Sequence, residues 1–414
     1  MQVHIIGGGI IGLSTAWYLE QAGYEVTVID ATNLEDGTSH GNAGMIVPSH
    51  FVPLAAPGVI AQGMRWMLNS KSPFYVKPRL SMELAQWLWQ FYRSCTPRNV
   101  AQAVPVLRAY NEWSKQLYQE FAQSPDFDFC FEKKGLLMLY RKSSTEHEEH
   151  EMAEQAAALG MEVEILDANA VKKLETGTEV EVLGGVFYPG DAHLYPNLFI
   201  HQLYRQLQAK GVKFLTGRTL QDFRTSKQGV SELILDDGQQ INCQNVVLAA
   251  GSWTAKLARK IDVKILLQDG KGYSTTIEKP IERPSIPTIL TEAKVAITPM
   301  GEDLRIGGTL EISNLSSRIN QARLQGILES LPQYYPNLKV DFPKTESVWH
   351  GFRPCTPDGL PYMGYSQKYK NLFIATGHAM MGMSMGPASG KLVAQMMSGQ
   401  ATEIPVGLFD VERF

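Results

Sequence analysis

Three glycines near the start of the chain form a GxGxxG loop whose spacing is typical of dinucleotide binding. Gly7, Gly9 and Gly12 directly follow the apolar run at residues 3–6, which we interpret as a short buried strand. Gly7 permits a tight turn, Gly9 lets the backbone approach a pyrophosphate, and Gly12 lets the next helix pack on the strand. The first turn of that helix, which contains Ile11, offers unpaired N–H groups and a positive dipole to phosphates.

An acidic residue ends the second predicted strand of this unit. A helical stretch at residues 13–19 leads to a β-branched run at residues 25–29, which ends in Asp30. The Asp30 carboxylate can accept hydrogen bonds from ribose hydroxyls, and its charge disfavours a ribose 2′-phosphate. The pattern therefore predicts FAD or NAD, and disfavours NADP. An NAD-dependent dehydrogenase with a plain Rossmann fold stays open as an alternative.

The composition is that of an ordinary globular protein. With 414 residues the chain is too long for one simple core, so we expect two domains. The net charge of −4 argues against nucleic acid as a partner. Four scattered cysteines without metal-ligand or CxxC spacing indicate reduced thiols. The chain runs from Met1 straight into a strand, and no stretch approaches the ~20 apolar residues of a membrane span, so we expect a cytoplasmic protein.

Strand–glycine–helix patterns recur in the middle and near the end of the chain. Residues 245–251 form an apolar run that ends in glycine, and residues 371–376 form another, which precedes a turn rich in glycine and methionine. The sequence between these segments has a different pattern, with alternating strands expected at residues 263–345. This order predicts one cofactor domain assembled from discontinuous segments, and a second domain inserted twice.

Four stretches of the sequence resemble the FAD-dependent D-amino acid oxidase superfamily. They are residues 7–30, residues 39–45 (SHGNAGM), residues 246–253, and a C-terminal pair at 349–359 (WHGFRPCTPDG) and 377–390. The first is shared by many flavoproteins, whereas the RP-x-TPDG string before a terminal strand–glycine–helix is much more specific. The stretches span the chain, and they resemble in particular the bacterial D-amino acid dehydrogenase and glycine oxidase branch, to which sarcosine oxidases are related.

The resemblance implies an α/β fold with a Rossmann-like FAD-binding domain assembled from discontinuous segments. The second domain would be an α+β substrate domain with an antiparallel sheet. We expect residues 1–50, 160–262 and 346–414 in the FAD-binding domain, and residues 51–159 and 263–345 in the substrate-binding domain. Some relatives attach FAD through a cysteine several residues before the TPD string. This chain has Trp-His-Gly there, so we predict noncovalent FAD.

The resemblance also implies cofactor contacts along the whole chain. The expected contacts are Gly7, Gly9, Ile11, Gly12, Asp30, Ser39, Asn42, Ala43, Gly44, Met45, Leu220, Gly251, Gly377, Gly382, Met383 and Ser384. Among them, residues 42–45 would follow the isoalloxazine edge, and the Leu220 backbone would meet the adenine. Residues 382–384 would present N–H groups to the flavin pyrimidine, where a helix N-terminus stabilises negative charge on reduced flavin.

Three residues are candidates for catalysis: Arg353, Tyr273 and His378. Arg353 would bind the substrate carboxylate bidentately and thereby orient the substrate; the alternative is a structural ion pair, for example with Asp358. Tyr273 resembles a family tyrosine that faces the substrate; the alternative is an ordinary strand tyrosine with a solvated hydroxyl. His378 could approach the flavin or the substrate amine, but we favour a turn histidine bound by backbone.

Other side chains give weaker signals. His50 and His193 are minor candidates, and no histidine has metal-ligand spacing, so we assign no metal. The aromatic segment at residues 87–92 is interpreted as a core helix. Its alternative is a membrane- or quinone-contacting face, because dehydrogenase relatives pass electrons to the respiratory chain. Membrane contact would then be peripheral, on the inner face of the cytoplasmic membrane.

These features predict FAD-dependent oxidative deamination of a small D-amino acid by hydride transfer from Cα to flavin N5. The string GHAMMGMSMGP at residues 377–387 suggests D-proline or D-hydroxyproline as the substrate, and the electrons would pass to an acceptor other than oxygen. A neutral amine needs little side-chain acid–base catalysis, so no triad is expected. The alternatives are a glycine- or sarcosine-oxidase-like enzyme that uses oxygen directly, an NAD-dependent dehydrogenase, and a non-catalytic flavin-binding subunit.

Overall fold

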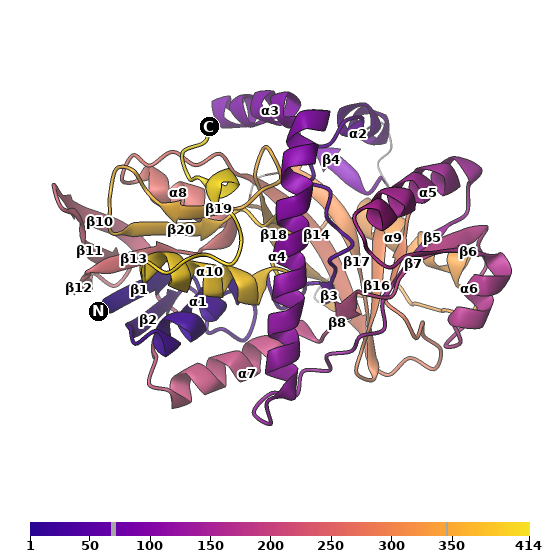
Figure 1. The fold of residues 1–414 in the computed structure, drawn as a ribbon, viewed down its shortest axis with the longest axis horizontal. Coiled ribbons are helices and arrows are strands. Elements are labelled where there is room, and N and C mark those ends of the chain that lie inside the picture. Colours follow the sequence, from indigo (N-terminus) through magenta and orange to yellow (C-terminus); the bar gives the residue numbers. More distant parts are fainter. Residues whose placement is uncertain (68–71, 314, 345–346) are drawn as a thin grey trace.

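The computed structural model describes residues 1–67, 72–313, 315–344 and 347–414. Within these ranges two large sheets dominate the fold, one of six strands on the left of Figure 1 and one of nine strands on the right. The two sheets carry separate hydrophobic cores, and a third core under helices α1 (Ile10–Gln21) and α4 (Pro97–Gln123) packs on the six-stranded sheet.

The six-stranded sheet is parallel except at one edge. Its order is β19 (Tyr362–Tyr365), β20 (Leu372–Thr376), β13 (Asn245–Leu248), β1 (Gln2–Ile6), β2 (Glu25–Asp30) and β9 (Lys213–Thr216). Strand β1 lies in the middle and pairs in parallel with both β2 and β13. In such sheets, ligands bind outside the carboxyl ends of the strands. The GxGxxG loop leaves β1 at that end, so the predicted Rossmann-like unit is confirmed.

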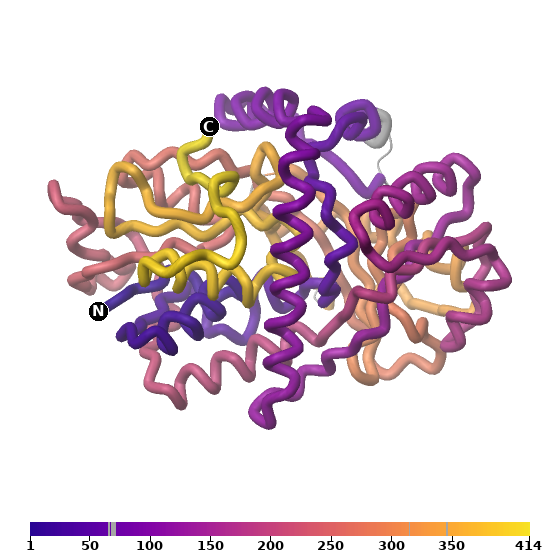
Figure 2. Tube along the Cα trace, viewed as in Figure 1, coloured from indigo at the N-terminus to yellow at the C-terminus, as the bar shows by residue number. Residues whose placement is uncertain are grey.

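The two ends of the chain meet on this sheet. Helix α1 (Ile10–Gln21) packs against α10 (Gly386–Met397) so closely that a Cβ on Gly390 would lie 2.2 Å from the Ser14 carbonyl carbon. Figure 2 shows the N-terminal and C-terminal segments side by side. Segments at opposite ends of the sequence thus build one unit, as the recurring glycine patterns predict.

The nine-stranded sheet is mostly antiparallel. Its order is β18 (Trp349–Cys355), β14 (Gln268–Ile277), β17 (Asp303–Ser313), β16 (Val295–Met300), β15 (Thr288–Leu290), β5 (Leu136–Tyr140), β7 (Gly184–Tyr188) and β6 (Glu164–Asp167), and β4 (Phe74–Val76) pairs with β17. Helix α9 (Gln321–Tyr334) covers one face with apolar side chains, among them Leu324 and Ile327. This arrangement agrees with the antiparallel sheet that the resemblance implies.

The other elements connect or cover the two sheets. The small sheets are β10 (Leu220–Ser226), β11 (Gly229–Leu235) and β12 (Gln240–Asn242), and β3 (Met45–Ile46) with β8 (Ala192–His193). The remaining α-helices in the described ranges are α2 (Val59–Met67), α3 (Met82–Ser94), α4 (Pro97–Gln123), α5 (Ser143–Ala158), α6 (Ala168–Leu174), α7 (Pro196–Ala209) and α8 (Thr254–Arg259). In the view of Figure 1, α4 crosses between the two large sheets.

Three strands bear on the predicted domain boundaries. Strands β6 and β7 fall in the range 160–262, and β18 falls in 346–414, yet all three pair in the nine-stranded sheet. A short apolar strand carries no local signal for the sheet that it joins, because its partners are distant in sequence. We therefore propose that residues 164–188 and 349–355 belong to the substrate-binding domain. The predicted boundary at residues 345 and 346 lies outside the described residues.

Candidate functional site

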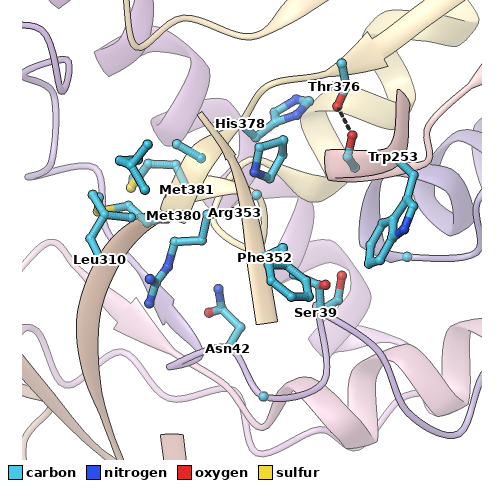
Figure 3. A pocket seen from close by; sticks show the side chains of 18 of the residues that line it. Ser39, Asn42, Trp253, Leu310, Phe352, Arg353, Thr376, His378, Met380 and Met381 are labelled. Atoms are coloured by element: carbon cyan, nitrogen blue, oxygen red, sulfur yellow. Dashed lines mark hydrogen bonds between the residues drawn. The ribbon is translucent and has the colours of Figure 1, made fainter. Parts of the chain in front are cut away.

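A cavity of about 1800 Å³ extends from the glycine loop of the six-stranded sheet to strands β17 and β18. Its walls also include residues 36–43, parts of α2 and α3, and the turn before α10. Pockets for single small ligands commonly measure about 300–1,000 Å³. The cavity therefore has room for a dinucleotide together with a small substrate, and Figure 3 shows part of its lining.

The glycine loop has no room for side chains at two of its positions. Gly7 has a φ of 109°, and a Cβ there would lie 2.5 Å from the Ala249 carbonyl oxygen. A Cβ on Gly12 would lie 1.8 Å from the Gly7 carbonyl oxygen, so α1 packs directly on the turn. This geometry leaves the N-terminus of α1 facing the cavity, as phosphate binding requires.

Two side chains hold the loop in place. Asp30 accepts a hydrogen bond from the Gly8 N–H at 2.6 Å and another from the Thr32 N–H at 2.7 Å. Ser39 Oγ accepts a hydrogen bond from the Ile10 N–H at 3.0 Å. The Thr32 hydroxyl also donates to Asp30 Oδ1 at 2.7 Å, whereas Oδ2 keeps a second lone pair that can accept from a ribose hydroxyl. The residues present therefore fit the adenosine half of FAD.

Most of the predicted cofactor residues line the cavity. They are Gly7, Gly9, Ile11, Asp30, Ser39, Asn42, Ala43, Met45, Leu220, Gly251, Gly382 and Met383. They come from segments spread over the whole chain, which the two sheets bring to one continuous wall. Their individual contacts with FAD remain predictions.

The other four predicted cofactor residues lie outside the lining: Gly12, Gly44, Gly377 and Ser384. Gly44 and Gly377 have φ angles of 70° and 86°, and Cβ atoms there would come within 2.2 Å and 2.5 Å of neighbouring atoms. The backbone, and not a ligand, therefore requires glycine at both positions. Ser384 is buried, donates to Asn111 Oδ1 at 2.8 Å and accepts from the Val47 N–H at 3.1 Å.

Arg305 holds the segment that is expected along the flavin edge, and sequence reasoning missed it. Its Nη1 donates to the carbonyl oxygens of His40 at 2.7 Å and Asn42 at 2.8 Å. The other guanidinium nitrogens donate to Thr276 Oγ1 and Asn197 Oδ1. Burial lowers the pKa of Arg305 to about 10, so it stays charged at neutral pH. Its loop partners are 265 and 263 residues away, so no local pattern could reveal the contact.

Arg353 reaches from β18 into the cavity, beside Leu310 and Met380 in Figure 3. Its Nη1 donates to the Thr309 carbonyl oxygen at 2.7 Å, and no carboxylate among the described residues pairs with it. Burial lowers the pKa of Arg353, but an arginine side chain stays protonated in proteins. A half-buried guanidinium without a carboxylate partner is suited to bind an anion.

The alternative interpretation of Arg353, an ion pair with Asp358, is wrong. Asp358 instead binds Arg413 bidentately, with Nε–Oδ2 at 2.7 Å and Nη2–Oδ1 at 2.9 Å. Arg413 lies near the C-terminus, outside the cavity lining. The charge of Arg353 is therefore left for a ligand.

Gly272 makes room for the Arg353 guanidinium. A Cβ on Gly272 would lie 2.2 to 2.5 Å from the Nη1, Nη2 and Cζ atoms of Arg353. We expect Gly272→Ala to displace the guanidinium and to raise the half-saturating substrate concentration about tenfold, since one charge-assisted hydrogen bond is worth roughly 1.5–3 kcal/mol. Steady-state kinetics measures this. Gly364→Ala, whose Cβ would meet its nearest atom at 3.7 Å, is the matched control; equal KM values in both variants would contradict the assignment.

The contacts of Tyr273 argue against its predicted role. Side chains alternate along a strand, so Tyr273 points to the face opposite the one on which Gly272 accommodates Arg353. The Tyr273 hydroxyl donates to Glu311 Oε1 at 2.5 Å and accepts from the Asn320 N–H at 3.1 Å. Although part of Tyr273 lines the cavity, its hydroxyl is engaged elsewhere.

The histidines differ in their access to the cavity. His378 lines it, but its Nε2 is hydrogen-bonded to Ser389 Oγ at 2.9 Å, and Ser389 also bonds the Tyr110 hydroxyl at 2.7 Å. Burial lowers the pKa of His378 to about 3, so the ring is neutral. Ser389 of α10 therefore binds the ring of this turn histidine, while the His378 backbone pairs with Cys355. His50 lines the cavity, whereas His193 is buried outside the lining.

The aromatic segment at residues 87–92 lies in α3 and is amphipathic. Trp87 is buried and stacks on Phe91, whereas Leu88, Trp89 and Tyr92 are 40%, 59% and 62% exposed. The expected core helix is thus found on one face only. In the described parts of the chain, no helix combines the length and apolarity that crossing a bilayer requires.

Comparison with known proteins relates this architecture to flavoenzymes. The family profile described as "DAO: FAD dependent oxidoreductase" matches residues 2–396. The chain is 30% identical to the D-amino acid dehydrogenase of Helicobacter pylori, over 97% of this chain and 96% of the relative. It is 32% identical to the D-amino acid dehydrogenase of Bradyrhizobium diazoefficiens, over 100% of this chain and 99% of the relative.

Solved structures show the same fold at lower identity. Glycine oxidase from Geobacillus kaustophilus has a TM-score of 0.77 at 20% identity, with 100% of this chain and 98% of that chain covered. L-proline dehydrogenase from P. horikoshii has a TM-score of 0.72 at 19% identity, with 100% and 97% covered. The cavity, the glycine loop and these matches agree: the chain belongs to the DAO family of FAD-dependent oxidoreductases.

Proposed function

We propose that this protein oxidises the Cα–N bond of a small D-amino acid, giving a 2-oxo acid and ammonia, or a cyclic imine from a ring substrate. The observation that carries the proposal is Arg353, a half-buried guanidinium in the cavity whose one hydrogen bond among the described residues goes to a backbone carbonyl. A substrate carboxylate supplies the missing anion. The D-amino acid dehydrogenases among the relatives support the substrate class.

The residues present divide the work between cofactor and substrate. FAD, when bound, accepts the hydride from Cα. Asp30 and Ser39 fix the loop that would hold its adenosine and pyrophosphate, and Arg305 fixes the segment at its flavin edge. Arg353 would orient the substrate through two parallel hydrogen bonds, and such positioning supplies much of an enzyme's rate enhancement.

The side-chain end of the substrate would meet an apolar wall. Leu54, Met138, Ile289, Leu310 and Met381 line the cavity, which suits a compact ring such as D-proline or D-hydroxyproline. The test is anaerobic mixing with D-proline, 4-hydroxy-D-proline, L-proline, D-alanine, glycine and sarcosine, each followed by the flavin absorbance. We expect bleaching with the D-amino acids. Bleaching by glycine or sarcosine alone would establish the oxidase-like alternative, and no bleaching at all would overturn the proposal.

Electrons are proposed to leave for an acceptor other than oxygen. The relatives named dehydrogenases support this acceptor, while the fold shared with glycine oxidase keeps direct use of oxygen as the second candidate. Admitting air, or a soluble quinone, to the reduced protein separates the two. Fast reoxidation by the quinone and slow reoxidation by air is the expected result.

Helix α3 is proposed as a peripheral contact with the inner face of the cytoplasmic membrane. Its exposed Leu88, Trp89 and Tyr92 lie beside exposed Arg93 and Arg98, a combination that suits an anionic lipid surface. Leu88 and Tyr92 also line the cavity, so an apolar quinone would have a short path. The wild type is expected to float with anionic vesicles, and the double variant Trp89→Ser/Tyr92→Ser is expected not to float. Equal flotation of the two proteins would reject this contact.

FAD is expected to be bound noncovalently. Cys355, the cysteine within the RP-x-TPD string, is buried, and no cysteine among the described residues lines the cavity. Acid precipitation should therefore release all of the flavin into the supernatant. A yellow pellet would show a covalent link.

The sequence left two further alternatives open, an NAD-dependent dehydrogenase and a non-catalytic flavin-binding subunit. The NAD-dependent dehydrogenase is wrong, because the family is FAD-dependent. A non-catalytic flavin-binding subunit would have no use for the unpaired Arg353 guanidinium, and bleaching of the flavin by a D-amino acid would exclude it.

A further inference from the structure

Two polar side chains, those of His50 and Ser49, connect the cavity with the buried carboxyl group of Asp191, which the proposed function does not use. Ser49 Oγ bonds Asp191 Oδ2 at 2.5 Å and His50 Nδ1 at 3.2 Å. The Ser49 N–H also donates to Asp191 Oδ1 at 3.1 Å, which fixes the carboxyl group. Asp191 is 1% exposed, whereas His50 lines the cavity. The chain of contacts thus runs from the cavity surface into the protein interior.

We infer that His50, Ser49 and Asp191 form a proton relay that takes a proton from the amino group of the substrate. The inference rests on the proposed function in one respect: an amino acid enters as an ammonium ion, which must lose a proton before Cα can release a hydride. Hydride transfer itself still needs no base. The relay adds the preceding step.

The last two transfers follow the hydrogen bonds that are present, and the first would run from the bound substrate to His50. A substrate N–H bond breaks as His50 Nε2 gains the proton, and His50 Nδ1 passes its own proton to Ser49 Oγ. Ser49 in turn passes its hydroxyl proton to Asp191 Oδ2. The imidazole is neutral before and after, and the carboxylate becomes a carboxylic acid. The reverse sequence returns the proton to solvent after the product leaves.

His50 and the Arg353 anchor line the same cavity, together with Lys294 and Gly308. Lys294 acts electrostatically on His50, and the Lys294 carbonyl oxygen lies 3.2 Å from the place of a Cβ on Gly308. Gly308 precedes Thr309, whose carbonyl oxygen binds Arg353. A substrate held by its carboxylate at Arg353 would therefore lie in the cavity that His50 lines.

The electrostatic setting of the relay suits a neutral imidazole and a carboxyl group that titrates. Burial, aided by Lys294, lowers the pKa of His50 to about 4, so the ring stays uncharged. Burial raises the pKa of Asp191 to about 7, and nearby Glu112 adds to this. The hydrogen bonds from Ser49 and the charge of Lys115 act in the other direction and lower the pKa of Asp191. Lys115 also forms an ion pair with Glu112 at 2.7 Å.

Two further groups face the relay from neighbouring elements. Tyr188, on β7, feels the charge of Asp191 and of Glu149, which lies on α5. Burial raises the pKa of Tyr188, so this residue stays protonated. Burial also raises the pKa of Glu149, and the charge of Lys294 acts against this shift. Asp191 is therefore the group along the relay that is expected to change charge near neutral pH.

Nitrogen NMR of the FAD-loaded protein with 15N-labelled histidine tests the relay without turnover. Above pH 7, ionised Asp191 accepts from Ser49, so His50 should carry its proton on Nδ1. Below pH 7, protonated Asp191 donates, and the proton should sit on Nε2. Asp191→Asn should hold one tautomer throughout, and His50→Gln identifies the signal. One unchanged tautomer of wild-type His50 from pH 5.5 to 8.5 would overturn the relay.

Anaerobic flavin reduction supplies the functional measurement. In the wild type, kcat/KM should rise with pH through about 7. In Ser49→Ala this rise should disappear, and kcat/KM should be about 100-fold lower than in the wild type at pH 7.5, since general acid–base steps contribute about 10²–10⁴-fold. Ser49→Thr keeps a hydroxyl and should restore the profile; the exposed His147→Gln is the control. A wild-type profile in Ser49→Ala rejects the relay. If no D-amino acid reduces wild-type flavin, the proposed function fails, and the tautomer measurement still decides on the relay.

Discussion

Arg353→Lys is expected to raise the half-saturating substrate concentration about 10- to 100-fold, because losing one charge-assisted hydrogen bond costs roughly 1.5–3 kcal/mol. Lysine keeps the charge but cannot form two parallel hydrogen bonds with a carboxylate. It also lacks the fork that lets Arg353 hold the Thr309 carbonyl oxygen and a ligand together. The substrate would therefore bind more weakly and turn more freely, so the rate of flavin reduction should fall as well. Stopped-flow reduction at several substrate concentrations measures both effects.

Arg413→Lys is the matched control for this experiment. Arg413 is also an arginine with a bidentate partner, Asp358, but it lies outside the cavity lining. Its replacement should lower the melting temperature and leave the half-saturating concentration unchanged. If Arg353→Lys behaves like Arg413→Lys, Arg353 is a structural residue and the carboxylate has another partner.

The sequence predicted those parts of the site that depend on neighbours in the chain. The roles of Gly7 and Gly12 follow from a spacing of a few residues, and the structure shows the tight turn and the close helix packing that this spacing implies. The position of Asp30 at the end of β2 also follows from the local strand pattern. These features need no knowledge of the rest of the fold.

The missed features all depend on distant pairings. Asp358 is a natural partner for Arg353 in sequence, but it pairs with Arg413, 55 residues further on. The face of Tyr273 is set by the register of β14 against β17 and β18, which its own sequence does not reveal. Arg305 and the relay from His50 to Asp191 likewise join segments that are more than a hundred residues apart.

Gly12→Ala is expected to abolish FAD binding and to destabilise the protein by about 3 kcal/mol or more, since overpacking usually costs roughly 1–3 kcal/mol. The new Cβ would lie 1.8 Å from the carbonyl oxygen and 2.9 Å from the carbonyl carbon of Gly7. These are backbone atoms of a tight turn, and the Gly7 N–H is also bound to the Ile29 carbonyl oxygen at 2.8 Å. The clash can therefore be relieved only by moving α1 away from β1.

A displacement of α1 would disrupt both the cofactor site and the packing of the helix. The N–H groups at its N-terminus would no longer face the cavity, and its packing against Gly390 of α10 would open. Flavin content and melting temperature should therefore fall together. Gly407→Ala, where nothing lies within 4 Å of the new Cβ, is the control and should change neither the flavin content nor the melting temperature.

Gly9→Ala separates the two effects: its Cβ would meet only Ser39 Oγ at 3.3 Å, so this variant should weaken FAD binding with little loss of stability. A yellow Gly12→Ala protein with the wild-type melting temperature would show that the loop does not depend on this contact.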